Sequence, residues 1–290
     1  MAALVVSCGL LLIRILVEAR TQVATIVTTG QPSKSAPPGQ PPTGLEAGAC
    51  VTYPATQGRS NHTVFLDAGH GGVDPGVVGS AGGHQVLEKD VTLAVARRLS
   101  TLLQANGYNV VMARTRDSSV TKLTASEVAA GTLKASAEHR DLVARTACAN
   151  SAGASILISI HFDSFSDPSV GGSETIYDSA RPFAAQNKRL AMDLQSALVA
   201  GLGTNDRGIW TDDQLSAPAL TTQGSNYGHL IELGPASPGW VDTPSLMPGV
   251  LVEPLFLTNA AEAHLASDPA GQQRIAQALA AGVHKYFSGA

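Results

Sequence analysis

The sequence predicts an α/β fold, a single three-layer domain in which helices flank a mixed, mostly parallel twisted sheet of about six strands. Two observations lead to this prediction. From Asn61 onward, short apolar runs alternate with longer segments of helical periodicity. The inner runs are apolar at almost every position, as expected for strands covered on both faces. Because 44% of the 290 residues are hydrophobic, the chain can bury such a core, and a disordered chain is excluded.

The apolar runs mark the strands. Residues 63–67 form the first, since Thr-Val-Phe-Leu-Asp leads into a glycine-rich loop over residues 69–83. Further β-rich runs predict strands over residues 108–113, 156–160 and 250–252. Helical spacing over residues 91–103 ends at Asn106-Gly107, a typical helix stop. Similar patterns predict helices around residues 142–149 and over residues 184–202 and 272–287.

The first sixty residues differ from the rest in composition. Residues 1–27 begin with a nearly continuous apolar stretch and are interpreted as a signal or membrane-anchor segment. Residues 28–60 are rich in Pro, Ser and Gly, which is typical of a linker. Residues 61–290 would then form the catalytic domain. Residues 5–8 resemble a bacterial lipoprotein cleavage box, but so few residues precede Cys8 that it is more simply one small apolar residue.

The other two cysteines leave two interpretations open. Cys50 and Cys148 could pair in an oxidising exterior. Alternatively, Cys148 is simply buried on the apolar side of its helix. The charge balance excludes one class of partner. The chain has 19 Lys and Arg residues against 23 Asp and Glu residues, so it has no excess of cationic side chains to neutralise phosphates. A duplex nucleic-acid partner is therefore not expected.

Metal-type ligands stand at the ends of predicted strands. His70 lies in the loop after the first strand, His161 directly follows the apolar run over residues 156–160, and Glu88 opens the first helix. Two histidines and one carboxylate are a common catalytic zinc set, with a fourth position open to water. His84 precedes Glu88 by four residues and is an alternative ligand. Any one of these residues alone could instead be an ordinary polar strand or helix end.

A further carboxylate ends the last predicted strand. Glu253 follows a buried apolar run, where a carboxylate is costly unless it is paired or used. Beside an activated water it could act as general base and then as general acid, although a salt-bridged strand end would have the same pattern. Glu232 competes for this role. Asp67 and Asp163 are interpreted as outer partners that orient the ligand imidazoles.

These motifs together resemble the zinc-dependent N-acetylmuramoyl-L-alanine amidases of bacterial peptidoglycan. The resemblance covers roughly residues 61–288 and rests on the order and spacing of Leu66-Asp-Ala-Gly-His-Gly-Gly72, Glu88-Lys-Asp-Val91, Ser159-Ile-His161 and Val252-Glu-Pro-Leu-Phe-Leu-Thr-Asn259. It implies that His70, Glu88 and His161 are the zinc ligands and Glu253 the catalytic glutamate. It also matches Arg140 to an arginine ahead of the family's Ala-Asn pair, and residues 230–233 to a leucine-rich strand without a catalytic group.

The resemblance implies hydrolysis of the amide between N-acetylmuramic acid and L-alanine, with Zn²⁺ as cofactor and peptidoglycan glycopeptide as substrate. It further implies export to the cell wall, the periplasmic space or the exterior, with the N-terminus as a membrane tether, and a monomeric enzyme; a regulatory activator is left open. Two rivals remain: a zinc peptidase acting on stem or crosslink peptides, and a non-catalytic wall-binding homologue.

The chain departs from the family pattern in two ways. Pro254-Leu255 follows Glu253 where the family has a small residue and glycine, which restrains the backbone there. Residues 116–138 and 211–248 are also longer than the minimal pattern, and Trp210, Tyr227 and Trp240 lie in or beside the second stretch. We expect these aromatic side chains to shape a glycopeptide groove.

Overall fold

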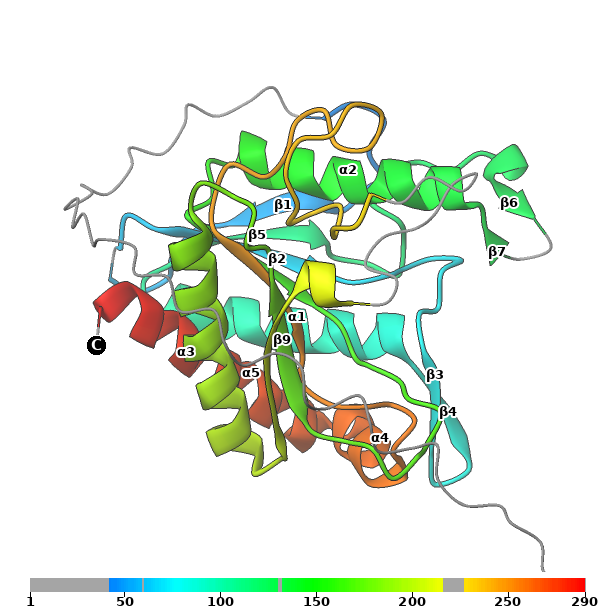
Figure 1. Ribbon diagram of the computed structural model, residues 1–290, viewed down its shortest axis with the longest axis vertical. Coiled ribbons are helices and arrows are strands. Elements are labelled where there is room, and N and C mark those ends of the chain that lie inside the picture. The colour runs from blue at the N-terminus through cyan, green and yellow to red at the C-terminus, as the bar shows by residue number, and fades with distance from the viewer. Residues whose placement is uncertain (1–41, 59, 130–131, 216–226, 290) are drawn as a thin grey trace, which may run out of the picture. The chain divides into compact units, whose positions relative to one another are not determined.

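A seven-stranded sheet forms the centre of the computed structural model, which describes residues 42–58, 60–129, 132–215 and 227–289 (Figure 1). The strand order is β1-β5-β2-β8-β11-β9-β10. The four inner strands β5, β2, β8 and β11 are parallel, whereas β1 is antiparallel to β5, and β9 to β11. The strands are β1 (Ala49–Tyr53), β2 (Thr63–Ala68), β5 (Asn109–Arg114), β8 (Ile156–Ile160), β9 (Ser173–Tyr177), β10 (Asp206–Thr211) and β11 (Gly249–Glu253). The predicted mixed, mostly parallel sheet is confirmed, with seven strands.

Helices cover both faces of this sheet (Figure 1). One face carries α1 (Glu88–Ala105), α3 (Ala184–Leu202) and α5 (Pro269–Ser288), with the short α4 (Ala260–Ser267) packed against α5. The other face carries α2 (Ala135–Ser151). The predicted three layers are therefore present. Among the described helices, none combines the length and the apolar character that a membrane span requires.

The inner strands are apolar because they contribute to two cores. In β8, Ile156, Ile158 and Ile160 pack toward α1, α3 and α5, whereas Leu157 packs toward α2. Successive strand residues point to opposite faces, so a strand between two helix layers needs an apolar residue at every position. Polar exceptions are also buried: Asp67 of β2 and Ser159 of β8 hydrogen-bond to each other, and Arg114 of β5 donates to Ala68 O.

Two hairpins lie outside the main sheet. Strands β3 (Val78–Ala81) and β4 (His84–Leu87) form a hairpin that leads directly into α1. Strands β6 (Val128–Ala129) and β7 (Thr132–Leu133) form a shorter one, after the 3₁₀ turn η1 (Ala125–Glu127) and before α2. A second 3₁₀ turn, η2 (Asp212–Gln214), follows β10. The two long insertions expected at residues 116–138 and 211–248 are thus partly ordered by short turns and pairings.

The structure corrects two expectations. The region expected to be linker up to residue 60 contains β1, which pairs with β5, so the domain begins before Asn61. The proline-rich composition ends at Pro42, and the apolar residues that follow can pair with a sheet edge. Residues 230–233, matched to a strand, instead include a turn in which Leu233 N donates to Leu230 O. The interpretation of residues 1–27, including Cys8, lies outside the described residues.

Candidate metal centre and active site

Three metal-type side chains converge at the ends of β2 and β8. His70 follows β2, His161 follows β8 and Glu88 opens α1. His70 Nε2 and His161 Nδ1 lie 3.1 Å apart, and Glu88 Oε1 lies 3.1 Å from the first atom and 3.0 Å from the second. The structure therefore brings together the three ligands predicted from the sequence. The alternative ligand His84 is exposed at the start of β4 and is not part of this group.

The spacing of the three donor atoms fits a metal ion. Around a tetrahedral zinc ion with ligand bonds of about 2 Å, neighbouring donor atoms are about 3.3 Å apart. The observed distances of 3.0 to 3.1 Å are close to this value. Two imidazoles and one carboxylate are also a donor set found in catalytic zinc sites. The residues present thus fit a catalytic divalent metal.

Backbone amides hold the Glu88 carboxylate in place. The side chain is 1% exposed, its Oε2 accepts a hydrogen bond from Val77 N at 2.8 Å, and its Oε1 accepts one from Phe162 N at 2.9 Å. The hairpin of β3 and β4 supplies the turn that brings Glu88 under the two histidines. Because both oxygens are fixed by backbone donors, the carboxylate is oriented before any ligand arrives.

His70 is held in an unusual backbone conformation. Its φ of 62° lies in the left-handed region that residues other than glycine seldom adopt. Asp74 Oδ2 lies 2.7 Å from His70 Nδ1, which directs Nε2 toward Glu88. Burial opposes a charge on the imidazole, but hydrogen bonds to Asp74 and Glu88 outweigh burial and raise the pKa of His70 to about 10. The two carboxylates therefore make this point strongly attractive to positive charge.

A buried arginine supports the loop that carries His70. Arg145 of α2 is 3% exposed and forms ion pairs with Asp67 Oδ1 at 2.6 Å and Asp141 Oδ2 at 2.9 Å. The same guanidinium donates to the carbonyl oxygens of Ala68 at 3.0 Å and His70 at 2.9 Å. Arg145 therefore joins α2 to the end of β2 and to the backbone of a ligand.

Arg140, the arginine predicted to support the site, lies elsewhere. It is exposed, and its guanidinium pairs with Glu127 at 2.5 Å. Arg145 and Arg140 are five residues apart on α2, so they point to different sides of a helix with 3.6 residues per turn. Both arginines precede the Ala149-Asn150 pair, but Arg145 is the one that contacts the backbone of His70.

The two aspartates expected to orient imidazoles have other partners. Asp67 accepts hydrogen bonds from Arg145 Nη1 and from Ser159 Oγ, the latter at 2.8 Å. Asp163 faces Glu174, and burial together with this neighbouring carboxyl raises the pKa of Asp163 to about 6. The aspartate that contacts a ligand imidazole is Asp74, which the sequence reasoning missed although it stands four residues after His70 in the same glycine-rich loop.

Glu253 ends β11 beside the strand that delivers His161. Strands β8 and β11 are parallel, Val252 pairs with Ile160, and His161 N donates to Val252 O at 3.0 Å. Among the described residues, none donates a hydrogen bond to the buried Oε2 of Glu253. Burial and then the nearby Glu88 carboxylate raise the pKa of Glu253 well above its ordinary value. An unsatisfied carboxyl next to metal ligands is suited to accept and return a proton.

A cavity of about 420 Å³ lies against the two ligand imidazoles. Its polar lining includes Asp74, Glu138, Arg145 and Glu232. Its apolar lining comes from β7, α2, β11 and the loop over residues 230–233, and consists of Leu133, Leu142, Leu251, Leu230, Ile231 and Leu233. Burial raises the pKa of Glu138 to about 7. Glu232 is 5% exposed, and burial followed by Asp67 raises its pKa well above the ordinary value. The predicted rival of Glu253 thus lies within the site region, on its cavity wall.

The aromatic residues of the long insertion have a structural role. Tyr227 and Trp240 stack with their ring centroids 5.9 Å apart, and His139 Nε2 lies 2.6 Å from Trp240 O. These contacts fasten the insertion to α2. Trp210 lies on β10 with 39% of its surface exposed. None of the three aromatic residues lines this cavity, and the expectation that they shape a glycopeptide groove stays a prediction.

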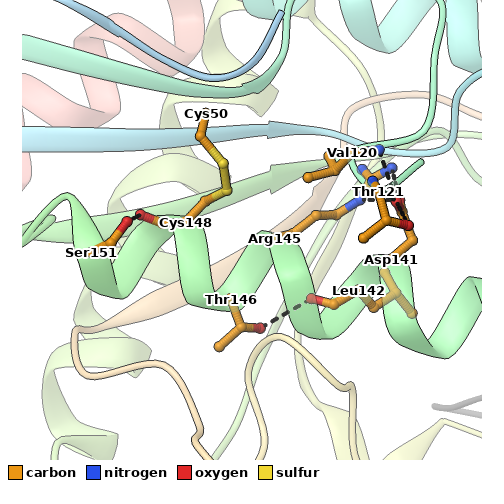
Figure 2. The surroundings of a disulfide bond; sticks show 9 residues. All are labelled: Cys50, Val120, Thr121, Asp141, Leu142, Arg145, Thr146, Cys148 and Ser151. Atoms are coloured by element: carbon orange, nitrogen blue, oxygen red, sulfur yellow. Dashed lines mark hydrogen bonds and ion pairs between the residues drawn. A yellow bond between two sulfur atoms is a disulfide. The ribbon is translucent and has the colours of Figure 1, made fainter. Parts of the chain in front are cut away.

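A disulfide closes the N-terminal part of the domain. Cys50 of β1 and Cys148 of α2 are bonded, with their Cα atoms 5.7 Å apart. Figure 2 shows Cys148 and Arg145 on the same stretch of α2, with Cys50 reaching the helix from β1. Of the two interpretations that the sequence left open, the paired one is correct. The bond anchors the helix that also carries Arg145.

Comparison with known proteins shows the family of this chain. The family model described as N-acetylmuramoyl-L-alanine amidase matches residues 64–285, a range that contains all three candidate ligands and Glu253. The chain belongs to this family. The predicted family and enzyme class are thereby confirmed.

Named relatives support the assignment. The amidase is 32% identical over 225 residues to N-acetylmuramoyl-L-alanine amidase LytC of Bacillus subtilis, covering 78% of this chain but 35% of LytC. It is 31% identical over 229 residues to the germination-specific N-acetylmuramoyl-L-alanine amidase of the same organism, covering 79% of this chain and 81% of that relative. The CwlD amidase from Clostridioides difficile, solved in complex with the GerS lipoprotein, has a TM-score of 0.61 and 27% identity and covers 79% of this chain and 100% of that one.

Proposed function

We propose that the amidase hydrolyses the amide between the lactyl group of N-acetylmuramic acid and the L-alanine of the stem peptide, with Zn²⁺ held by His70, Glu88 and His161. One observation supports this proposal: the donor atoms of these three side chains lie 3.0 to 3.1 Å from one another. The chain in which they lie belongs to the amidase family. Bound Zn²⁺ supplies Lewis acidity, which activates water and polarises the scissile carbonyl.

Glu253 moves the proton in this scheme. Its carboxylate accepts a proton from the attacking water, and its carboxyl group then delivers that proton to the leaving amine nitrogen. The raised pKa of Glu253 favours the return step, since a carboxyl of ordinary pKa holds a proton too weakly near neutral pH. Pro254 follows Glu253 directly and limits the backbone freedom of the strand end that presents it.

Glu232 is a second candidate for the proton carrier, because it lines the cavity with His70 and His161. Its charged neighbours are Asp67, Arg145 and Asp141, and Arg145 is the one that donates to the His70 carbonyl oxygen. The charged group that raises the pKa of Glu253 most is instead the carboxylate of Glu88, a proposed ligand. This difference favours Glu253, and Glu232 is assigned to the wall of the cavity.

A matched pair of isosteric variants tests the assignment. We expect Glu253→Gln to lower kcat on purified peptidoglycan by about 100-fold or more, the usual contribution of a general acid–base group, while zinc content is retained. Glu232→Gln should lower kcat much less. Full activity of Glu253→Gln, or equal losses in both variants, would contradict the role of Glu253.

The reaction product separates the proposal from its rivals. Mass spectrometry of digested peptidoglycan should show free stem peptides that begin with L-alanine and glycan strands that have lost them. Cleaved crosslinks would identify a peptidase instead. Binding without any soluble product, in a preparation that contains zinc, would identify a wall-binding homologue.

We also propose that the amidase acts outside the cytoplasmic membrane as a monomer. The disulfide supports export, because such bonds persist in oxidising compartments. The apolar stretch near the N-terminus and the proline-rich segment after it favour a membrane tether. CwlD was solved with a lipoprotein, GerS, which makes a regulatory partner of similar kind a reasonable target for co-purification from the native host.

A further inference from the structure

We propose that the amidase has a second divalent metal site, formed by Asp178, Asp212 and His229, which takes a zinc-like transition-metal ion and anchors the loop that walls the active-site cavity. Asp178 follows β9, Asp212 opens η2 and His229 belongs to the loop before Leu230. One carboxylate oxygen from each aspartate and His229 Nδ1 lie within 4.8 Å of one another. This group shares no residue with the first site.

The two carboxylates are deeply buried and poorly neutralised. Asp178 is 0% exposed and Asp212 is 1% exposed. The imidazole nitrogen of His229 lies 2.9 Å from Asp178 Oδ2 and 3.3 Å from Asp212 Oδ1, but only the second contact has the geometry of a hydrogen bond. Asp178 Oδ2 therefore points into the cluster without a hydrogen-bond partner among the described residues. A buried, unpartnered carboxylate oxygen is costly unless a cation meets it.

The neighbouring cation does not fill this role. Arg181 lies close enough to interact with Asp178 electrostatically, but its guanidinium donates to the carbonyl oxygens of Leu233 and Gly234 and to Ser245. Tyr227 contacts the His229 ring, and its hydroxyl donates to Pro235 O. Neither side chain donates to Asp178 Oδ2, which stays without a hydrogen-bond partner among the described residues, 2.9 Å from His229 Nδ1.

The donor set indicates the class of ion. Calcium takes six to eight oxygen ligands, whereas an imidazole nitrogen with carboxylates is typical of zinc and related transition metals. Rigid elements hold two of the ligands: Asn187 Nδ2 of α3 donates to Asp178 O at 2.9 Å, and Asp212 belongs to a capped 3₁₀ turn. The ion would therefore draw His229, the ligand on the loop, toward two fixed carboxylates.

The position of the cluster explains what the ion would do. Leu230 N donates to Asp212 Oδ2 at 2.9 Å, and residues 230–233 line the cavity that contacts His70 and His161. An ion at the second site would hold the start of this wall in place. It would therefore order the cavity without contacting the reacting atoms, which makes the three ligands positioning residues.

Metal stoichiometry tests the proposal. The chelated protein is dialysed against excess Zn²⁺, then against buffer, and bound zinc is measured by mass spectrometry. We expect two equivalents in the wild type and one in Asp212→Asn. The matched control Asp213→Asn removes the adjacent, exposed carboxylate and should keep two. In Asp212→Asn, the affinity for the second zinc ion should fall by more than roughly 100-fold, which is the loss expected when a residue that only supports a metal ligand is removed.

Variants at His229 and His70, together with Ca²⁺ as a competing ion, separate this proposal from its alternatives. His229→Gln changes the partly exposed ligand, so it disrupts folding less than a change at the buried Asp178. It should also reduce the bound zinc to one equivalent. His70→Ala should lose the other equivalent and keep this one, so failure of the first site is distinguishable. Equal zinc content in Asp212→Asn and Asp213→Asn would overturn the proposal, as would occupancy by Ca²⁺ that excludes Zn²⁺.

Discussion

At the scale of single residues, Arg145 is the buried charge on which the His70 loop depends. Replacing it with methionine leaves the carboxylates of Asp67 and Asp141 without their ion pairs in the protein interior. Loss of one partner of a buried pair costs about 3–5 kcal/mol. We therefore expect Arg145→Met to lower the free energy of unfolding by that amount, measured by urea denaturation followed by circular dichroism.

The neighbouring Arg140 provides the control for this prediction. It lies on the same helix and pairs with Glu127 at the surface, where an ion pair contributes little. Arg140→Met should leave the denaturation midpoint nearly unchanged. A loss of stability in Arg140→Met equal to that in Arg145→Met would show that the effect comes from the helix rather than from the buried network.

Gly69 allows the close approach of His161. A Cβ atom at this position would lie 2.4 Å from Cε1 and Nε2 of the His161 ring. Gly69→Ala should therefore displace the ring and weaken zinc binding, measured by competition with a chromophoric chelator. Gly82→Ala, in the exposed turn between β3 and β4, is the control, because an added Cβ atom there meets no neighbouring atom. The φ of Gly82 is 57°, so the substitution should lower the free energy of unfolding by about 1 kcal/mol through backbone strain and leave zinc affinity unchanged. Unchanged zinc affinity in Gly69→Ala would contradict this account.

The site residues that sequence could predict are those marked by a strand end or a helix start. His70, Glu88 and His161 each follow such a mark, and parallel strands place their carboxyl ends together. Asp74 and Arg145 were missed because their role depends on a partner distant in space or on a turn of unknown shape. Asp67 was misassigned for the same reason, since its partner Arg145 is 78 residues away.

At the scale of elements, the disulfide ties the edge strand β1 to α2. Cys50 and Cys148 are 98 residues apart, and cross-linking a loop of this size restricts the unfolded chain strongly. Reduction should lower the free energy of unfolding by about 2–5 kcal/mol. The double variant Cys50→Ser/Cys148→Ser should show the same loss and no further response to reductant. Equal stability of oxidised and reduced protein would refute the prediction.

The elements that sequence predicted are those whose pattern is local. β2 and β8 are apolar at most positions, and α3 has its predicted bounds, with Gly203 in the left-handed conformation at its C-terminal cap. β9 was not predicted, because it begins with the polar residues Ser173, Glu174 and Thr175 although the strand is buried at every position. Such a composition does not look like a buried strand in the sequence. The polar groups of these residues are satisfied by distant partners, such as Gln195 for Thr175 and Arg207 for Glu174. Only the assembled fold supplies those partners.

At the scale of the whole molecule, the candidate metal site formed by His70, Glu88 and His161 joins the ends of β2 and β8 to the start of α1. An ion bound there stabilises the folded state only, and at a free concentration 1,000 times its Kd the gain is about 4 kcal/mol. Addition of Zn²⁺ to the chelated protein should therefore raise Tm, measured by calorimetry. The rise should be smaller in His161→Ala; an equal rise in both proteins would contradict binding at this site.

The covalent loop also has a consequence for the proposed export, because it separates the candidate active-centre residues into two groups along the chain. Residues 50 to 148 enclose His70 and Glu88, whereas His161 and Glu253 lie beyond the loop toward the C-terminus. A chain crossing the membrane from its N-terminus can close the disulfide while half of the active centre is still untranslocated. In the proposed exported hydrolase, the candidate third ligand His161 and the proposed proton carrier Glu253 would therefore arrive after this loop has closed.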